Sequence, residues 1–195
     1  MKVLAIIPAR GGSKRLKKKN IYPIAGKPML YWAIHACKKS KYSIEPWVST
    51  EDQEIKEVAI KYGAKVHNRD HNLSGDKVYK QAVIRSAARY IFDLHGEYDI
   101  VISLQPNSPE IESYHLDEAI DKLIYYRRSE IISVNGSGMQ NAAFRVFKGS
   151  YVFQEDLSTN CGFYVCPLED VHTVEDVEKL EKKYSANKPQ EEGGK

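Results

Sequence analysis

The sequence predicts an α/β fold of three layers, in which helices cover both faces of a mostly parallel central sheet. Short apolar runs alternate along the chain with longer segments of helical periodicity, which is typical of parallel sheets. The runs are continuously apolar, as expected of strands that are buried on both faces. A hydrophobic fraction of 42% over 195 residues supports a single packed domain, which we place at residues 1–184.

The first element is a strand at Val3–Ile7, where five apolar residues follow each other. A basic loop, residues 8–20, comes next and contains a glycine pair. The following segment, Met29–Lys39, has apolar residues at helical spacing, and Pro28 suits the first turn of a helix. This part of the chain therefore predicts a strand, a loop and a helix.

A second strand is expected at Trp47–Ser49 and a helix at residues 51–62. Thr50 is its predicted N-cap, because a threonine hydroxyl can accept a hydrogen bond from the first free amides. Gly63 is expected to end this helix, and Ala64–Val66 to form the third strand.

The middle of the chain repeats this alternation after a polar loop at residues 67–75. A long amphipathic segment predicts a helix over Val78–Leu94, and Asp99–Leu104 is another buried strand. The turn at residues 105–109 contains two prolines, and Leu116–Tyr126 is predicted to be helical.

The last third begins with a strand at Ile131–Val134 and then departs from the alternation. Residues 144–147 and 151–153 predict a small hairpin appendage that turns at Lys148-Gly149. We expect residues 135–160 to form this reduced hairpin or dimerisation region, followed by a strand at Gly162–Cys166.

The final helix is expected at Val174–Tyr184, with Thr173 as its cap. Asp176 stands three residues after Thr173, so the pair approximates a capping box. Residues 185–195 are predicted to be a mobile polar tail, because terminal polar segments rarely pack.

The charge is concentrated at the start of the chain, although the net charge is only +3. Residues 1–41 hold 11 lysines and arginines and no acidic residue, whereas the rest holds 18 basic and 26 acidic residues. This distribution favours a local anion site over a nucleic-acid surface, so no nucleic-acid partner is expected. A solvated basic loop or a short nucleic-acid patch is the alternative that we rank lower.

The cysteine pattern and the hydropathy indicate the cellular compartment and whether a membrane partner is expected. Cys37, Cys161 and Cys166 are odd in number and widely spaced, which favours free thiols in a reducing cytoplasm. The sequence has no apolar run of membrane-spanning length, so we expect no membrane partner.

The basic loop has the features of an anion cradle on the tip of the first strand. Six of residues 8–20 are basic and none is acidic. Gly11 and Gly12 let the backbone approach a ligand closely, and successive backbone N–H groups can bind an anion. Arg10 can contact two phosphate oxygens at once. These observations indicate a triphosphate site.

The common nucleotide and hydrolase motifs do not occur. The dinucleotide pattern Gly-x-Gly-x-x-Gly is missing, and Gly26-Lys27 is followed by Pro28, which excludes a Walker A loop. A Gly-x-Ser-x-Gly elbow is missing too, which argues against an α/β hydrolase.

Several motifs in order give the chain a resemblance to the acylneuraminate cytidylyltransferases, within the glycosyltransferase-A-like nucleotidyltransferases. The family includes synthetases of CMP-sialic acid and relatives for pseudaminic and legionaminic acids. The matching segments, over roughly residues 3–180, are Ile7–Lys14, Lys19-Asn20, Gly26–Pro28, Val48–Asp52, Arg69 with Leu73 and Asp76, Leu104–Pro109, Asn160 with Tyr164, and Asp170–Asp176. The chain resembles CMP-Kdo synthetases less, because of Lys19-Asn20.

The resemblance implies a nucleotide-diphospho-sugar transferase-like fold and a cytoplasmic, Mg²⁺-dependent enzyme of polysaccharide biosynthesis. It would transfer CMP from CTP to the anomeric hydroxyl of a 2-keto sugar acid and release pyrophosphate. The partners implied are CTP and an acidic sugar, with a homodimer as a candidate assembly.

The resemblance also assigns roles to individual positions. The residues implied in catalysis are Arg10, Lys19 and Asp170. Those implied in nucleotide binding are Ala9, Arg10, Gly11, Gly12, Ser13, Lys19, Asn20, Arg69 and Asp76. Those implied in binding the sugar acid are Gln105, Ser108 and Asn160. Asp170 is the implied metal ligand, and His172 is a weaker second candidate.

The chain departs from the family pattern at several places. His172 replaces the second metal aspartate of the family, although imidazole prefers softer metals than Mg²⁺. Residues 77–80 replace small hydroxyl residues that face the base, and Cys161 replaces a glycine. Relatives carry a dimerisation extension between Val134 and Asn160, where this chain is short, so a homodimer would need another route.

These departures keep two further readings open. One is a nucleotidyltransferase with another nucleoside triphosphate or another acidic acceptor. The other is a nucleotide-binding or regulatory relative that has lost catalysis. Nucleotide binding without pyrophosphate release would distinguish this last reading from an enzyme.

Overall fold

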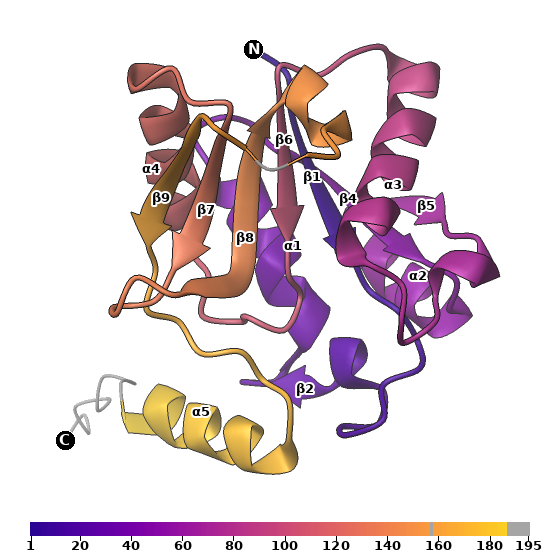
Figure 1. Cartoon of the computed structure of the whole chain (residues 1–195). Helices are drawn as coiled ribbons and strands as arrows, with labels where there is room; N and C mark the ends of the chain where they lie inside the picture. Colours follow the sequence, from indigo (N-terminus) through magenta and orange to yellow (C-terminus); the bar gives the residue numbers. More distant parts are fainter. Residues whose placement is uncertain (157, 187–195) are drawn as a thin grey trace, which may run out of the picture.

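One sheet of seven strands runs through the molecule in the order β5-β4-β1-β6-β8-β7-β9 (Figure 1). We describe it from a computed structural model over residues 1–156 and 158–186. The strands of this sheet are β1 (Val3–Pro8), β4 (Glu45–Thr50), β5 (Lys65–Asn68), β6 (Ile100–Leu104), β7 (Glu130–Val134), β8 (Gln140–Lys148) and β9 (Cys161–Val165). Neighbouring strands are parallel except where β8 pairs antiparallel with β6 and β7.

Helices cover both faces of this sheet. The helices are α1 (Met29–Lys39), α2 (Gln53–Lys61), α3 (Lys80–His95), α4 (Ser113–Tyr125) and α5 (Val174–Ala186). The short 3₁₀ helices are η1 (Lys19–Ile21), η2 (His71–Leu73) and η3 (Gly149–Phe153). Helices α1, α2 and α4 pack on one face, and α3 packs on the other together with η3. The predicted α/β class with a mostly parallel sheet is therefore confirmed.

A small unit lies beyond the carboxyl ends of the strands. It consists of α5 and the two-stranded ribbon of β2 (Pro23–Ile24) and β3 (Lys27–Pro28) (Figure 1). Leu16 of the basic loop is buried against Val177 and Leu180 of α5. In addition, the Glu181 carboxylate accepts a hydrogen bond from the Ala25 amide at 2.6 Å. These contacts with helix α5 therefore hold Leu16 of the basic loop and the turn at Ala25 in place.

The predicted hairpin at Lys148-Gly149 is wrong. Residues 144–147 lie inside β8, whose two edges are already paired with β6 and β7. Residues 151–153 form η3 instead of a second strand, because Val152 is fully buried on the face of the sheet that α3 covers.

One predicted helix cap differs from the structure, and another is confirmed. Asp52, not Thr50, is the N-cap of α2, because its carboxylate accepts a hydrogen bond from the Ile55 amide at 3.0 Å. Thr50 belongs to β4. Thr173 and Asp176 do exchange the hydrogen bonds of a capping box, which confirms the predicted start of α5.

The predicted tail begins inside α5, which extends to Ala186, and its residues 187–195 lie outside the described residues. Among the residues that the structure describes, no helix has both the length and the apolar character that crossing a membrane requires.

Gly149 is expected to be intolerant of any side chain. A Cβ atom at this position would lie 1.7 Å from the backbone carbonyl oxygen of Tyr98, which belongs to a rigid strand connection. We expect Gly149→Ala to lower the free energy of unfolding by about 3 kcal/mol, because the backbone must shift to relieve the overlap. Urea unfolding measures this change.

Gly136→Ala is the matched control for this substitution, since a Cβ atom there would meet nothing within 4 Å. Equal unfolding midpoints for the two variants would contradict the packing described around Gly149.

Candidate active site

A cavity of about 280 Å³ opens where β1 and β6 end, beside the basic loop. Its wall contains seven of the residues singled out from the sequence: Arg10, Ser13, Lys19, Asn20, Arg69, Asp76 and Gln105. Polar side chains from three separate stretches of the chain therefore converge on one space, as expected at the carboxyl ends of parallel strands.

A larger hollow of about 690 Å³ lies between α1, α5 and the start of α4. Its acidic Glu110 is paired with Lys183, and the Tyr184 hydroxyl donates to the Pro109 carbonyl. Because these polar groups already have partners within the protein, we take the smaller cavity as the candidate site.

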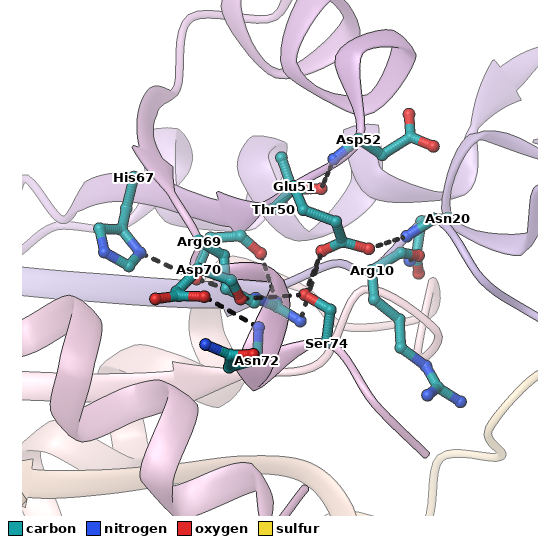
Figure 2. A network of polar contacts seen from close by, with 12 residues as sticks. Arg10, Asn20, Thr50, Glu51, Asp52, His67, Arg69, Asp70, Asn72 and Ser74 are labelled. Atoms are coloured by element: carbon teal, nitrogen blue, oxygen red, sulfur yellow. Dashed lines mark hydrogen bonds and ion pairs between the residues drawn. The ribbon is translucent and has the colours of Figure 1, made fainter.

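The glycine turn is held in place by Glu51, which follows β4. One oxygen of its carboxylate accepts a hydrogen bond from the Gly11 amide at 2.9 Å, and the other accepts one from Ser74 Oγ at 2.9 Å. Figure 2 shows this carboxylate between the turn and the side chains of Arg69 and Ser74. The Gly11 amide is thus already engaged, so the turn is fixed rather than free to reshape.

Close packing explains why a glycine is needed at position 11. A Cβ atom there would lie 2.3 Å from the carboxylate of Asp52, which caps α2. At Gly12 a Cβ atom would meet nothing within 4 Å. Gly11 therefore allows the turn to lie against the start of α2, whereas Gly12 is open to the surface.

Two neighbours complete the scaffold of the turn. The buried Asn20 donates from Nδ2 to the carbonyl oxygen of Arg10 at 2.8 Å. The buried Ala9 donates its amide to the carbonyl oxygen of Ser49 at 3.0 Å. Both contacts fix the backbone on either side of the Arg10 side chain, so these residues position the loop in this structure.

Arg69 lies on the floor of the cavity and is 6% exposed. Its guanidinium donates to the carbonyl oxygen of Ser49, and its Nη1 lies 3.9 Å from the Glu51 carboxylate. Burial lowers the pKa of Arg69, while Glu51 opposes this shift. The arginine therefore ties the end of β4 to the glycine turn and presents one side to the cavity.

Asp76 neutralises the cations at the mouth of the cavity. Its carboxylate pairs with Arg10 Nη1 at 2.6 Å and with the ammonium of Lys14. Lys14 and then Arg10 lower the pKa of Asp76, so this carboxylate stays charged at neutral pH. An anion that binds Arg10 must therefore compete with Asp76.

Two half-buried lysines add positive charge deeper in the wall. Burial lowers the pKa of Lys19, and the neighbouring Arg15 and Arg10 lower it further. Burial also lowers the pKa of Lys80 at the start of α3, with Arg145 as a second cause. For both lysines the Asp170 carboxylate acts in the opposite direction and opposes this lowering of the pKa.

The loop after β6 supplies amide and hydroxyl groups. Gln105 faces the cavity, and its buried Nε2 has no hydrogen-bond partner among the described residues. The Ser108 hydroxyl donates to Asp170, and the Val171 amide donates to the Asn107 carbonyl at 2.8 Å. Ser108 therefore orients Asp170 here, while Gln105 lines the cavity and has a buried, unpaired Nε2 among the described residues.

Asp170 is the carboxylate that the resemblance assigns to a divalent metal, and it lines a neighbouring hollow beside α5 rather than this cavity. No cluster of three or more His, Cys, Asp or Glu side chains occurs in the described part of the chain. Mg²⁺ is commonly held by one or two carboxylates together with substrate phosphates and water, so a single aspartate fits it.

His172 is poorly placed to be a second ligand. Its Nδ1 lies 3.3 Å from the Arg15 guanidinium. Burial lowers the pKa of His172, and Lys19 and Arg15 lower it further, so the imidazole lies in a cationic environment that disfavours a nearby dication.

The structure does not bring Asn160 to the cavity, so a substrate contact from Asn160 is wrong for this arrangement. The residue precedes β9 and thus lies at the amino end of a strand, whereas the cavity lies at the carboxyl ends. Its side chain bonds Arg128 Nη1 at 3.0 Å and the Arg127 carbonyl at 3.1 Å, which ties it to the start of β7.

Glu51 and Lys80 are the site residues whose roles the sequence did not indicate. Glu51 stood in a recognised motif but was assigned only to the start of a helix. Lys80 was identified only as one of residues 77–80, which differ from the family pattern beside the nucleotide base. The position of Glu51 directly after β4 is the signal that could have identified it, because the glycine turn follows the neighbouring parallel strand β1.

Comparisons with known proteins show the family to which the chain is similar. A family model described as "Cytidylyltransferase" matches residues 4–138. The N-acylneuraminate cytidylyltransferase A of Danio rerio is 37% identical over 132 residues, which are 68% of this chain and 30% of that protein. The pseudaminic acid cytidylyltransferase of Campylobacter jejuni is 42% identical over 125 residues, 64% of this chain and 54% of that protein.

The chain thus spans between about a third and about half the length of these two relatives. Among solved structures, a CMP:2-keto-3-deoxy-manno-octonic acid synthetase complexed with CTP superposes with a TM-score of 0.77 at 15% identity. The match covers 95% of this chain and 99% of that one, which shows a shared fold.

Proposed function

The chain belongs to the cytidylyltransferase family, and from this membership we propose that it transfers CMP from CTP to the anomeric hydroxyl of a 2-keto sugar acid. The acceptor oxygen bonds to the α-phosphorus of CTP while the bond to the β-phosphate oxygen breaks, so pyrophosphate leaves and the hydroxyl proton is released. The proposed acid is of the sialic, pseudaminic or legionaminic type.

The convergence of Arg10, Lys19 and Ser13 beside the fixed glycine turn is the observation that supports this proposal most. A leaving pyrophosphate gains negative charge during the transfer, and fixed cations stabilise that charge without having to reorganise. Burial lowers the pKa of Lys19, and the Asp170 carboxylate opposes this shift. We propose that these three residues hold the triphosphate.

The loop after β6 supports a place for the acceptor. Gln105 has a buried Nε2 donor without a partner among the described residues, and such a donor gains from a ligand oxygen. We propose that Gln105 binds the sugar acid. Ser108 is proposed to act through Asp170, to which its hydroxyl donates.

A divalent metal is part of this proposal, with Asp170 as its ligand and Mg²⁺ as the ion. Asp170 would hold the ion, and Mg²⁺ would supply positive charge that neutralises phosphate oxygens. We assign no metal role to His172, because Arg15 already lies against its ring. We also propose a cytoplasmic location, which the three free cysteines support.

A matrix of pyrophosphate-release assays tests this function, with each of the four nucleoside triphosphates combined with several sugar acids and Mg²⁺. We expect release only with CTP and a 2-keto sugar acid. Release with another nucleotide would contradict the proposed base choice. A thermal shift with CTP but no release would favour the impaired, nucleotide-binding relative, since a bound nucleotide stabilises the folded state.

Asp76→Asn is expected to strengthen CTP binding. The native carboxylate competes with the triphosphate for Arg10 and Lys14, whereas asparagine has no charge to compete with. We expect the Kd measured by calorimetry without metal to fall roughly two- to tenfold, the range of exposed ion pairs. If Asp76 instead binds the nucleotide directly, the same variant will bind CTP more weakly.

A further inference from the structure

Strand β9 forms an outer edge of the sheet, with no described strand beyond it (Figure 1). Its even-numbered residues point their backbone groups toward β7, since the Cys166 amide donates to the Val134 carbonyl and the Ser129 amide donates to the Asn160 carbonyl. Backbone direction alternates along a strand. Cys161, Phe163 and Val165 therefore direct their N–H and C=O groups to the open edge.

This edge lacks the features that normally prevent strands from pairing. Exposed edges usually carry charges, prolines or bulges. The five residues of β9 include no charge and no proline, and their register with β7 is unbroken. Phe163 and Val165 are 60% and 51% exposed, on the face of the sheet opposite α4. The residues of β9 thus form a regular and apolar template for another strand, and the charge that contacts its open edge comes from Lys122 of α4.

Two opposite charges of α4 flank the middle of this edge. The Glu118 carboxylate accepts a hydrogen bond from the Tyr164 hydroxyl at 2.7 Å. The Lys122 ammonium donates to the carbonyl oxygen of Phe163 at 3.3 Å and lies 5.7 Å from the centre of the Tyr164 ring. Glu118 and Lys122, one helical turn apart on α4, therefore both contact the middle of this edge.

The same stripe of α4 has an aromatic residue near each end. Tyr114 is 48% exposed and Tyr125 is 77% exposed, and their spacing from Glu118 and Lys122 places all four on one side of the helix. Read in one direction, the stripe is aromatic, acidic, basic and aromatic. A two-fold rotation reverses the stripe. Glu118 of one copy then lies opposite Lys122 of the other, and Tyr114 of one copy lies opposite Tyr125 of the other.

We propose that β9 pairs antiparallel with β9 of a second copy of this chain, around a two-fold axis beside Phe163. Phe163 would then face the partner's Phe163, and Cys161 would face the partner's Val165. Lys122 would release the Phe163 carbonyl to the new strand pair and bind the partner's Glu118. A two-fold interface requires such a self-complementary surface.

A second copy fits this surface better than an unrelated strand, because the charges of the stripe neutralise each other only under reversal. The proposed axis lies away from the candidate cavity, since the residues of the cavity come from other strands and loops. The inference therefore does not depend on the proposed enzymatic activity.

Sedimentation velocity over a range of protein concentrations tests the interface on the wild-type chain and on Phe163→Pro. Proline removes an N–H group that faces the open edge and no hydrogen bond to β7, so the fold should persist. We expect a wild-type dimer and a dimerisation constant weakened by roughly tenfold or more in the variant. A wild-type chain that stays monomeric at every concentration would overturn the proposal.

Charge reversal gives a second test that does not alter the strand. Lys122→Glu should weaken the dimer, because two acidic residues would then face each other. The double variant Glu118→Lys with Lys122→Glu should restore it. Lys61→Glu on α2, an exposed reversal far from β9, is the control and should leave the dimer unchanged. Single and double variants that dimerise alike would contradict the proposed pairing.

Discussion

Arg10→Ala is expected to reduce CTP-dependent pyrophosphate release by roughly 100- to 1,000-fold, the loss seen when one donor to a developing negative charge is removed. The Arg10 side chain lines the cavity, and its backbone is fixed by Asn20. Alanine therefore removes the guanidinium without releasing the loop. Initial rates at saturating CTP and sugar acid measure the loss in turnover.

Lys17→Ala is the matched control, because Lys17 is an exposed cation of the same loop and does not line the cavity. Its rate should stay close to that of the wild-type protein. If both variants lose activity to the same extent, the loop contributes only general positive charge, and the assigned role of Arg10 is wrong.

Asp170→Asn is expected to have a comparable effect, with a loss of roughly 100-fold or more in turnover at low Mg²⁺. Asparagine keeps an oxygen that can accept the Ser108 hydroxyl, so the local structure should persist. It lacks the charge that binds a hard dication. The Mg²⁺ concentration needed for half-maximal activity should rise, which a purely structural residue would not cause.

Glu169→Gln provides the control for this substitution, since Glu169 is the neighbouring acid and is exposed. Its Mg²⁺ dependence should match the wild-type dependence. If Asp170→Asn had the same Mg²⁺ dependence as the wild-type protein, the proposed role of Asp170 as a metal ligand would be wrong.

Much of the fold was predictable because local periodicity determines where buried strands and amphipathic helices occur. Val3–Ile7 and Asp99–Leu104 were identified as strands from their continuous apolar character. The hairpin at Lys148-Gly149 was not predictable in this way, because the pairing of β8 with β6 and β7 depends on contacts far apart in the sequence. Burial of Val152 then decided the conformation of η3.

In the candidate site, too, some features are predictable from the local sequence and others depend on contacts between distant residues. A glycine turn with basic neighbours, placed after a strand, was sufficient to predict where Arg10 and Lys19 lie. The sequence did not reveal that Glu51 engages the Gly11 amide, or that Asp76 pairs with Arg10, because both contacts join separate loops. Asn160 was predicted to contact the substrate, but it precedes β9 and lies at the amino end of that strand. The end of the sheet at which it lies follows from the direction of β9, which the local sequence does not give.

Phosphorus NMR of a single reaction tests the central claim most directly. The wild-type protein is incubated with CTP, Mg²⁺ and a 2-keto sugar acid, and a parallel sample lacks the acid. Cytidylyl transfer predicts equal amounts of pyrophosphate and of a new phosphodiester resonance, both only in the sample with the acid. A protein that binds CTP but forms no phosphodiester with sialic, pseudaminic or legionaminic acid would contradict it.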